Sequence, residues 1–398
     1  MTKLIFSSSF ITTLIMCVNF LFKIYISHIY AKNALGIYYT FLDIVSLGVT
    51  FLSGFKDSLI VAFDRFNKNE VFYVYLVSFI TASSIVFMVD TVYFIQLKFS
   101  FPIILFFMLF VLNLAMIFFS YLNSALKNYK VMLFESLVMS MGYIFSFVIF
   151  YFFIKNIYAL IYAIAFSYIM KILYLLFFKR ESLQLKITNL TEYKVFFINT
   201  LLSSLMYFFS GLFVSMSGIV IWKLFHDTSL LSEYQVVVRS IFFSLVAIFV
   251  FPLNSMLFPQ ISALIAGRQF NEIQRIEKKM FRYMMLFWSL LIILLFLMKY
   301  IIIILFPPSY NHSYIYINYM LMFLPLIAYT TFALNIIKAF NRFDFALYVR
   351  LFGSLIFFIS IGIFYFAGFS AKFIFVSFDL AFASMAMMSF YYKKRLLK

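Results

Sequence analysis

Residues 283–306 read YMMLFWSLLIILLFLMKYIIIILF, and Lys299 is the one charged side chain in this stretch. A helix that crosses a bilayer needs about 20 consecutive residues that are mostly apolar. The stretch meets this requirement with residues to spare. It therefore predicts a membrane-spanning helix rather than a helix packed on the surface of a soluble core.

The composition of the whole chain agrees with this stretch. Hydrophobic residues make up 66% of the 398 residues and charged residues only 11%, whereas soluble domains carry roughly 25% charged residues. A water-soluble fold with this composition would expose large apolar patches and aggregate. The sequence therefore predicts an all-α polytopic membrane protein.

Apolar runs bounded by charged or turn residues predict about twelve membrane-spanning helices. The first six cover 5–30, 35–63, 71–96, 101–124, 131–154 and 157–178, and the second six cover 195–221, 231–264, 280–306, 313–338, 344–368 and 371–392. We expect two six-helix lobes, at 1–178 and 195–398, joined by a cytoplasmic linker at 179–194.

The basic residues predict the orientation of the chain. Of the 31 lysines and arginines, 20 flank one set of helix ends, 6 flank the opposite set and 5 fall inside helices. Loops that stay in the cytoplasm carry the excess of Lys and Arg, so we expect both termini to be cytoplasmic. The net charge of +17 is spread over short loops, which disfavours a nucleic-acid partner because no soluble basic domain exists to bind it.

The sequence offers little for covalent or metal chemistry. The chain has one cysteine (Cys17), three separated histidines and 10 glycines, with no glycine-rich phosphate loop. No polar segment is long enough to form an enzyme domain outside the membrane. We therefore predict a protein that is not an enzyme, with no catalytic residues, no metal site and no cofactor.

Two pairs of short segments indicate an internal duplication. Leu35-Gly36-Ile37-Tyr38 and Leu231-Ser232-Glu233-Tyr234 open long apolar helices at an offset of 196 residues. Similarly, 125–130 and 337–342 each close the fourth helix of a predicted half. Because six helices return the chain to its starting side, the sequence predicts a parallel 6+6 repeat about an axis along the membrane normal.

The stretch from Tyr234 to Phe358 resembles the C-terminal half of bacterial polysaccharide flippases, which belong to the multidrug/oligosaccharidyl-lipid/polysaccharide (MOP) exporter superfamily. The residues that carry the resemblance are Tyr234, Val238-Arg239, Pro259-Gln260-Ile261-Ser262-Ala263-Leu264, Gly267-Arg268, Leu305-Phe306, Ser309-Tyr310 and Asn335-Ile336-Ile337-Lys338-Ala339, with Leu35-Gly36-Ile37-Tyr38 in the first half. About twelve helices are two fewer than peptidoglycan-precursor flippases of the superfamily carry, which makes that subfamily a poorer match.

The resemblance implies a flippase in the bacterial inner membrane that works by alternating access. Its expected substrate is an oligosaccharide linked to undecaprenyl pyrophosphate, such as an O-antigen (lipopolysaccharide) repeat unit. Membrane lipids, a coupling ion (H⁺ or Na⁺) and other proteins of polysaccharide assembly are the expected partners. No nucleic acid is expected.

Charged side chains inside the predicted helices are the candidate site residues, because each costs about 2.5–3.5 kcal/mol to insert. Lys23, Lys56 and Arg239 fall on the first, second and eighth helices, which by resemblance line the central cavity of this superfamily. We predict that these cations bind the substrate phosphates. Lys171 lies near the end of its helix, and we expect it to reach the lipid headgroups.

Acidic side chains form two further groups of candidates. Asp43 and Asp57 are predicted to balance the cavity cations, and Asp43 coincides with Arg239 at the 196-residue offset. Asp379 and Asp90 are the candidates for coupling to an ion.

Two other functions remain open. A polytopic polysaccharide polymerase or ligase would need a sizeable outer loop, and the predicted outer loops are short. A cation-coupled drug antiporter of the same superfamily would need buried acids, whereas most of the predicted buried charges are basic.

Overall fold

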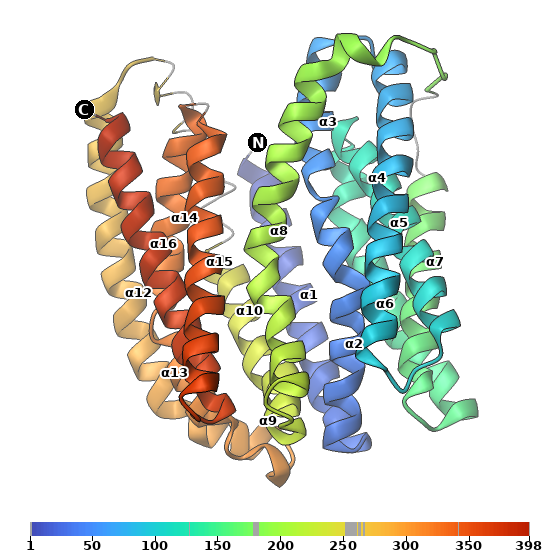
Figure 1. Ribbon diagram of the computed structural model, residues 1–398, viewed down its shortest axis with the longest axis vertical. Coiled ribbons are helices and arrows are strands. Elements are labelled where there is room, and N and C mark those ends of the chain that lie inside the picture. Colours follow the sequence, from blue (N-terminus) through green and yellow to red (C-terminus); the bar gives the residue numbers. More distant parts are fainter. Residues whose placement is uncertain are drawn as a thin grey trace. The chain divides into compact units, whose positions relative to one another are not determined.

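The computed structural model describes residues 2–126, 128–177, 183–250, 261, 264–265, 267–340 and 342–397. Within these residues every regular element is a helix (Figure 1). Candidate membrane spans number 11, and Thr13–Ile29 is a shorter apolar helical stretch. The predicted all-α polytopic membrane fold is confirmed.

The long helices follow the predicted order along the chain. Their bounds are α1 Thr2–Ile29, α2 Lys32–Phe51, α3 Gly54–Arg65, α4 Lys68–Leu97, α5 Ile103–Ala125, α6 Tyr129–Ile154, α7 Tyr158–Phe177, α8 Lys194–Lys223, α9 Thr228–Glu233, α10 Arg239–Phe249, α12 Phe270–Leu305, α13 Ser313–Leu321, α14 Leu324–Ala339, α15 Phe343–Phe366 and α16 Ile374–Leu396. Short 3₁₀ turns occur at Leu190–Tyr193 (η1), Pro308–Tyr310 (η3) and Ala371–Phe373 (η4), and a π turn, η2, occupies Tyr234–Val238.

Large apolar side chains cover the outside of these helices. Phe152, Phe296 and Phe366 are exposed by 76%, 78% and 88% respectively. In α12 only 17% of the most apolar window is buried against the rest of the protein. Surfaces of this kind are stable in contact with lipid and not in water, which agrees with a multi-pass membrane protein.

The described chain divides into two compact units. The first contains residues 1–19 and 40–215, and the second contains residues 20–39 and 216–398. The turn between α1 and α2 thus belongs to the second unit, although it lies near the start of the sequence. The predicted lobes at 1–178 and 195–398, the linker at 179–194 and the 6+6 repeat remain predictions.

Aromatic side chains fill the interior of each unit. In the first, Tyr75 stacks on Phe118 at 4.9 Å between ring centroids, and the Tyr75 hydroxyl donates to the Phe118 carbonyl oxygen. In the second, Phe378 of α16 packs between Phe357 and Phe382. Figure 1 shows α14, α15 and α16 running side by side in this unit.

Two predicted spans are interrupted, and the interruptions set the local geometry. The second predicted span, 35–63, divides into α2 and α3, with a turn at Leu52 and Ser53. The eighth, 231–264, begins as α9 and passes through the π turn η2 before α10 begins at Arg239. Asp227 caps the start of α9, because its Oδ1 accepts from the Leu230 amide at 2.8 Å. The described part of α10 ends at Phe249.

Candidate functional site

The π turn η2 positions Arg239 at the first residue of α10. π turns inside helices occur frequently at functional sites. One guanidinium nitrogen of Arg239, Nη1, donates to Gln235 Oε1 at 2.9 Å, and the guanidinium carbon lies 5.5 Å from the centre of the Phe243 ring. Gln235, Arg239 and Phe243 follow one another at intervals of four residues and so share a helix face. The amide and the ring hold a guanidinium that is only half-buried.

Lys23 of α1 contacts the residue that follows Arg239. Its ammonium donates to Ser240 Oγ at 2.8 Å and lies 4.5 Å from the centre of the Tyr39 ring. Ser240 is 7% exposed, whereas Lys23 is half-buried. The structure therefore brings two of the three predicted substrate-binding cations to adjoining positions within the second unit.

This pair has the chemistry of an anion site. An arginine offers a planar fork that binds two phosphate oxygens, and a lysine supplies a compact charge with three donors. Both cations lie near aromatic rings, whose faces attract a cation. We define Lys23, Tyr39, Gln235, Arg239, Ser240 and Phe243 as the dibasic site.

Lys56, the third predicted cation, belongs to the first unit. There its charge acts on Lys171 of α7. Lys171 lies 3.8 Å from Glu135 Oε1, and Ser120 Oγ lies 3.0 Å from both carboxylate oxygens of Glu135. Lys171 is only 7% exposed, so the expectation that it reaches the lipid headgroups is wrong. It is a buried partner of Glu135.

The predicted acidic residues lie in different settings. Asp43 is 5% exposed and belongs to the first unit, whereas Arg239 belongs to the second. The side chain of Asp57 lies outside the described residues. Asp90 is 4% exposed, and its Oδ2 accepts from the backbone amide of Gly48 at 3.1 Å. Asp379 Oδ1 is buried and has no hydrogen-bond partner among the described residues.

Sequence reasoning missed a buried ion pair at the turn between α1 and α2. Lys32 Nζ lies 2.5 Å from Glu233 Oε1 and donates to Ser229 Oγ at 2.9 Å and to the Ser309 carbonyl oxygen at 2.8 Å. Ser313 Oγ donates to the other oxygen of Glu233 at 3.1 Å. We call these five residues the hairpin anchor.

The aromatic neighbour of the hairpin anchor is Tyr310, which adds no charge to the ion pair. The Lys32 ammonium lies 5.4 Å from the centre of the Tyr310 ring. Burial, and to a smaller extent the Glu233 carboxylate, raise the pKa of Tyr310 well above its usual range, so this phenol stays neutral. The signal that could have revealed the anchor is that Glu233 is the one acid in the predicted span 231–264.

One of the two segment pairs that suggested the internal repeat, Leu35–Tyr38 and Leu231–Tyr234, meets next to this anchor. A side-chain carbon added at Gly36 would lie 3.0 Å from Ser232 Cα and 3.1 Å from its nitrogen. Only glycine allows α2 to approach α9 this closely. Leu35–Tyr38 and Leu231–Tyr234 therefore meet through Gly36 and Ser232, a contact that the sequence comparison did not predict.

Comparisons with known proteins agree on one architecture. No family model and no curated protein sequence matches the chain. An inward-facing multidrug resistance MATE family transporter of the MOP superfamily superposes with a TM-score of 0.76 at 11% identity, covering 98% of each chain. The chain has the fold of MOP-superfamily transporters.

Two further structures with this fold have different described roles. The lipid II flippase MurJ, in an inward closed conformation, superposes with a TM-score of 0.76 at 12% identity, covering 99% of this chain and 88% of MurJ. A MOP superfamily transporter from Pyrococcus furiosus, described as having a binding pocket of reverse polarity, superposes with a TM-score of 0.68 at 14% identity and covers 99% and 95%. Structures with this fold are thus described both as multidrug resistance transporters and as a lipid II flippase.

Proposed function

We propose that the chain is a flippase that moves an anionic lipid-linked oligosaccharide across the bacterial inner membrane by alternating access. The substrate we infer is an undecaprenyl-pyrophosphate-linked repeat unit of O-antigen or another surface polysaccharide. The observation that carries the proposal is the contact of Lys23 with Ser240, beside Arg239. Two half-buried cations on apolar helices suit a substrate that carries phosphate.

Moving a phosphate group through the membrane costs free energy. A phosphate without charge partners would lose its hydration and gain nothing in return. The dibasic site supplies the arginine fork of Arg239 and, through the contact of Lys23 with Ser240, a lysine charge at the next position of α10. The Tyr39 ring beside Lys23 is proposed to contact the sugar next to the phosphate. Lys56, Asp43 and Asp57 are proposed as further charges of the substrate path.

A cation-coupled drug antiporter is the second candidate. Two acids favour it: Asp90, which is buried, and Asp379, whose Oδ1 is buried. Each could exchange a proton or Na⁺ during transport. These acids are equally compatible with an ion-coupled flippase, in which Asp379 would couple substrate movement to H⁺ or Na⁺. The acids therefore do not distinguish an antiporter from a flippase. The nature of the transported substrate does.

A polymerase or ligase is the least favoured alternative. The described segments that join the long helices are short, and they leave no domain for glycosyl-transfer chemistry. The three superposed structures named above are described as transporters or as a flippase. The proposed location is the inner membrane, with both termini in the cytoplasm and other polysaccharide-assembly proteins as partners.

The test is transport by the purified chain in proteoliposomes. Undecaprenyl-pyrophosphate-linked oligosaccharide and a cationic dye would be offered in parallel to the native protein and to Arg239→Ala. The flippase proposal predicts movement of the glycolipid that Arg239→Ala abolishes. Movement of the dye alone would support the antiporter instead.

The matched control is Arg350→Ala, which removes another arginine from a membrane-spanning helix of the same unit. Arg350 lies in α15, and its Nη1 contacts Met385 Sδ at 3.6 Å. We expect this variant to transport the glycolipid normally, because Arg350 is not part of the dibasic site.

A further inference from the structure

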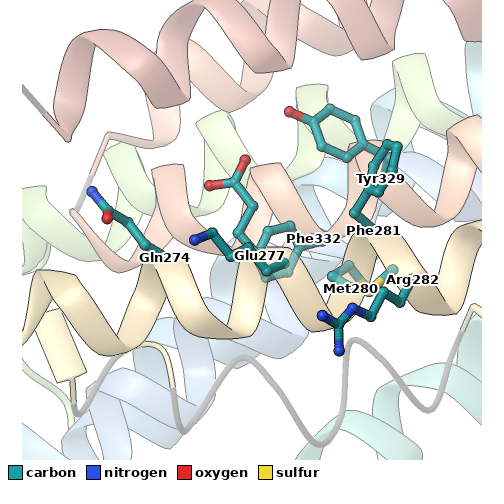
Figure 2. Close-up of a pocket in the computed structure, with 8 residues that line it drawn as sticks. Gln274, Glu277, Met280, Phe281, Arg282, Tyr329 and Phe332 are labelled. Atoms are coloured by element: carbon teal, nitrogen blue, oxygen red, sulfur yellow. The ribbon is translucent and has the colours of Figure 1, made fainter.

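A cavity of about 540 Å³ opens between α12 and α14 in the second unit. This size falls within the range of small-molecule sites, roughly 300–1,000 Å³. Figure 2 shows its lining residues, which come from both helices: Gln274, Glu277, Lys278, Met280, Phe281, Arg282, Tyr329 and Phe332. Met280 and Phe332 are buried, while Lys278 and Arg282 are exposed. The cavity therefore combines an apolar floor with basic groups at its rim.

A buried lysine neutralises Glu277, the one acid among the described residues that line this cavity. Lys393 of α16 is 2% exposed and forms an ion pair with Glu277. Its ammonium also lies 3.1 Å from the Tyr329 hydroxyl oxygen and 5.2 Å from the centre of that ring. Because Glu277 is paired, the charges of Lys278 and Arg282 remain as an excess of positive charge. The cavity is electrostatically suited to an anion.

The cavity lies where α12 passes from charged to apolar sequence. From Glu272 to Arg282 the helix carries acidic and basic residues, and from Tyr283 to Met298 it carries none. Phe281 and Met285, four residues apart on α12, are exposed by 62% and 52%. At such a boundary a helix leaves the hydrocarbon and enters the headgroup layer. A ligand that fits here needs a negative head and an apolar body.

We propose that this cavity binds an anionic glycerophospholipid. The phosphate contacts Lys278 and Arg282, and a polar head such as the free glycerol of phosphatidylglycerol reaches Tyr329 and Gln274. The acyl chains extend over the exposed surface of Phe281 and Met285. Basic pockets between membrane helices at the cytoplasmic boundary bind anionic lipid heads through these forces, and nothing in this inference depends on the substrate of the transporter.

The test is native mass spectrometry of the full-length chain in detergent, titrated with dioleoyl phosphatidylglycerol. Dioleoyl phosphatidylcholine, whose head has no net charge, is titrated in parallel. We expect phosphatidylglycerol to bind preferentially. The variant Lys278→Ala/Arg282→Ala should weaken that binding about tenfold or more, because it removes two charge-assisted contacts.

The matched control is Arg275→Ala/Lys279→Ala. It removes the same charge from the same stretch of α12, at exposed residues that do not line the cavity. We expect this control to bind phosphatidylglycerol like the native chain. The variant Lys278→Arg/Arg282→Lys keeps both charges and should bind nearly as well, which shows that the loss in the alanine variant is not a folding defect.

Two results would overturn the proposal. Equal weakening in both alanine variants would mean that the lipid responds to the general charge of the helix and not to the cavity. Displacement of phosphatidylglycerol by an equal concentration of glycerol 3-phosphate would show that the cavity is a site for a soluble phosphate. Retention of the lipid against glycerol 3-phosphate supports the proposal.

Discussion

The ammonium of Lys32 lies 2.5 Å from the Glu233 carboxylate, although 201 residues separate them in the sequence. Their side chains are only 15% and 5% exposed. This ion pair ties the turn between α1 and α2 to α9, and α9 leads through the π turn into Arg239. The pair therefore supports the segment that holds the dibasic site.

Removing the lysine should strongly destabilise the second unit. Lys32→Met leaves Glu233 as a buried charge without its cation, and breaking a buried pair in this way costs about 3–5 kcal/mol. We expect a clear fall in Tm in detergent. Lys155→Met, at the exposed end of α6, should leave Tm within a degree or two of the native value, as expected for surface substitutions of about 0.5 kcal/mol or less.

The double variant Lys32→Met/Glu233→Gln distinguishes the ion pair from simple packing. With both charges gone, no uncompensated charge remains, and part of the lost Tm should return. A double variant no more stable than Lys32→Met would show that the pair is not the source of the effect.

A methyl group at Gly36 should separate α2 from α9. The added carbon would lie too close to the backbone of Ser232, which cannot rotate away. Overpacking of this kind costs about 1–3 kcal/mol, so Gly36→Ala should lower Tm. In Gly362→Ala the added carbon meets no atom within 4 Å, and a gain of a few tenths of a kcal/mol is expected from the better helix propensity of alanine. A Tm for Gly36→Ala equal to that of Gly362→Ala would contradict the close approach.

Asp379 should be needed for ion-coupled transport. Its buried Oδ1 lacks a hydrogen-bond partner among the described residues, so a bound proton or Na⁺ would satisfy it. Asp379→Asn should remove the dependence of transport on an imposed H⁺ or Na⁺ gradient in proteoliposomes. Asp344→Asn is the control, because Asp344 pairs with Arg342 at 2.7 Å near the start of α15. Normal ion dependence in Asp379→Asn would exclude Asp379 from coupling.

The orientation predicted from the basic residues is tested with fused reporters. Tags after Lys398 and at residue 186 should report the cytoplasm, and a tag inserted at Asn311 should report the opposite side of the membrane. A tag at residue 186 that reports the outer side would contradict both the positive-inside count and the 6+6 arrangement.

The sequence predicted the helices well because their apolar runs are long and bounded by charge. It also placed Arg239 inside the eighth predicted helix, and in the structure Arg239 is the first residue of α10, directly after η2. Periodicity could not reveal the turn at Leu52 and Ser53 or the π turn, because a short break in the helical hydrogen-bond pattern leaves the surrounding run long enough to be read as one span. The contact of Lys23 with Ser240, the residue after Arg239, could not be predicted, because no sequence pattern marks Ser240.

Buried ion pairs were the main omission. Lys32 looked like a loop residue, and Lys171 looked like a lysine near a helix end. Each pairs with an acid far along the chain or on another helix, Glu233 and Glu135 respectively. Separation along the sequence does not show which charged side chains pair in the fold. The partners of these lysines could therefore not be predicted from one sequence.

The most direct test of the central claim is the activity of Arg239 variants in a bacterium that lacks its own flippase, with membrane abundance measured in the same cells. We expect Arg239→Ala to abolish surface polysaccharide export at normal abundance. Arg239→Lys should retain part of it, because the charge remains but the two-pronged contact with phosphate is lost. Arg350→Ala should export normally. Full export by Arg239→Ala at native abundance would contradict the assignment of the dibasic site to the substrate phosphate.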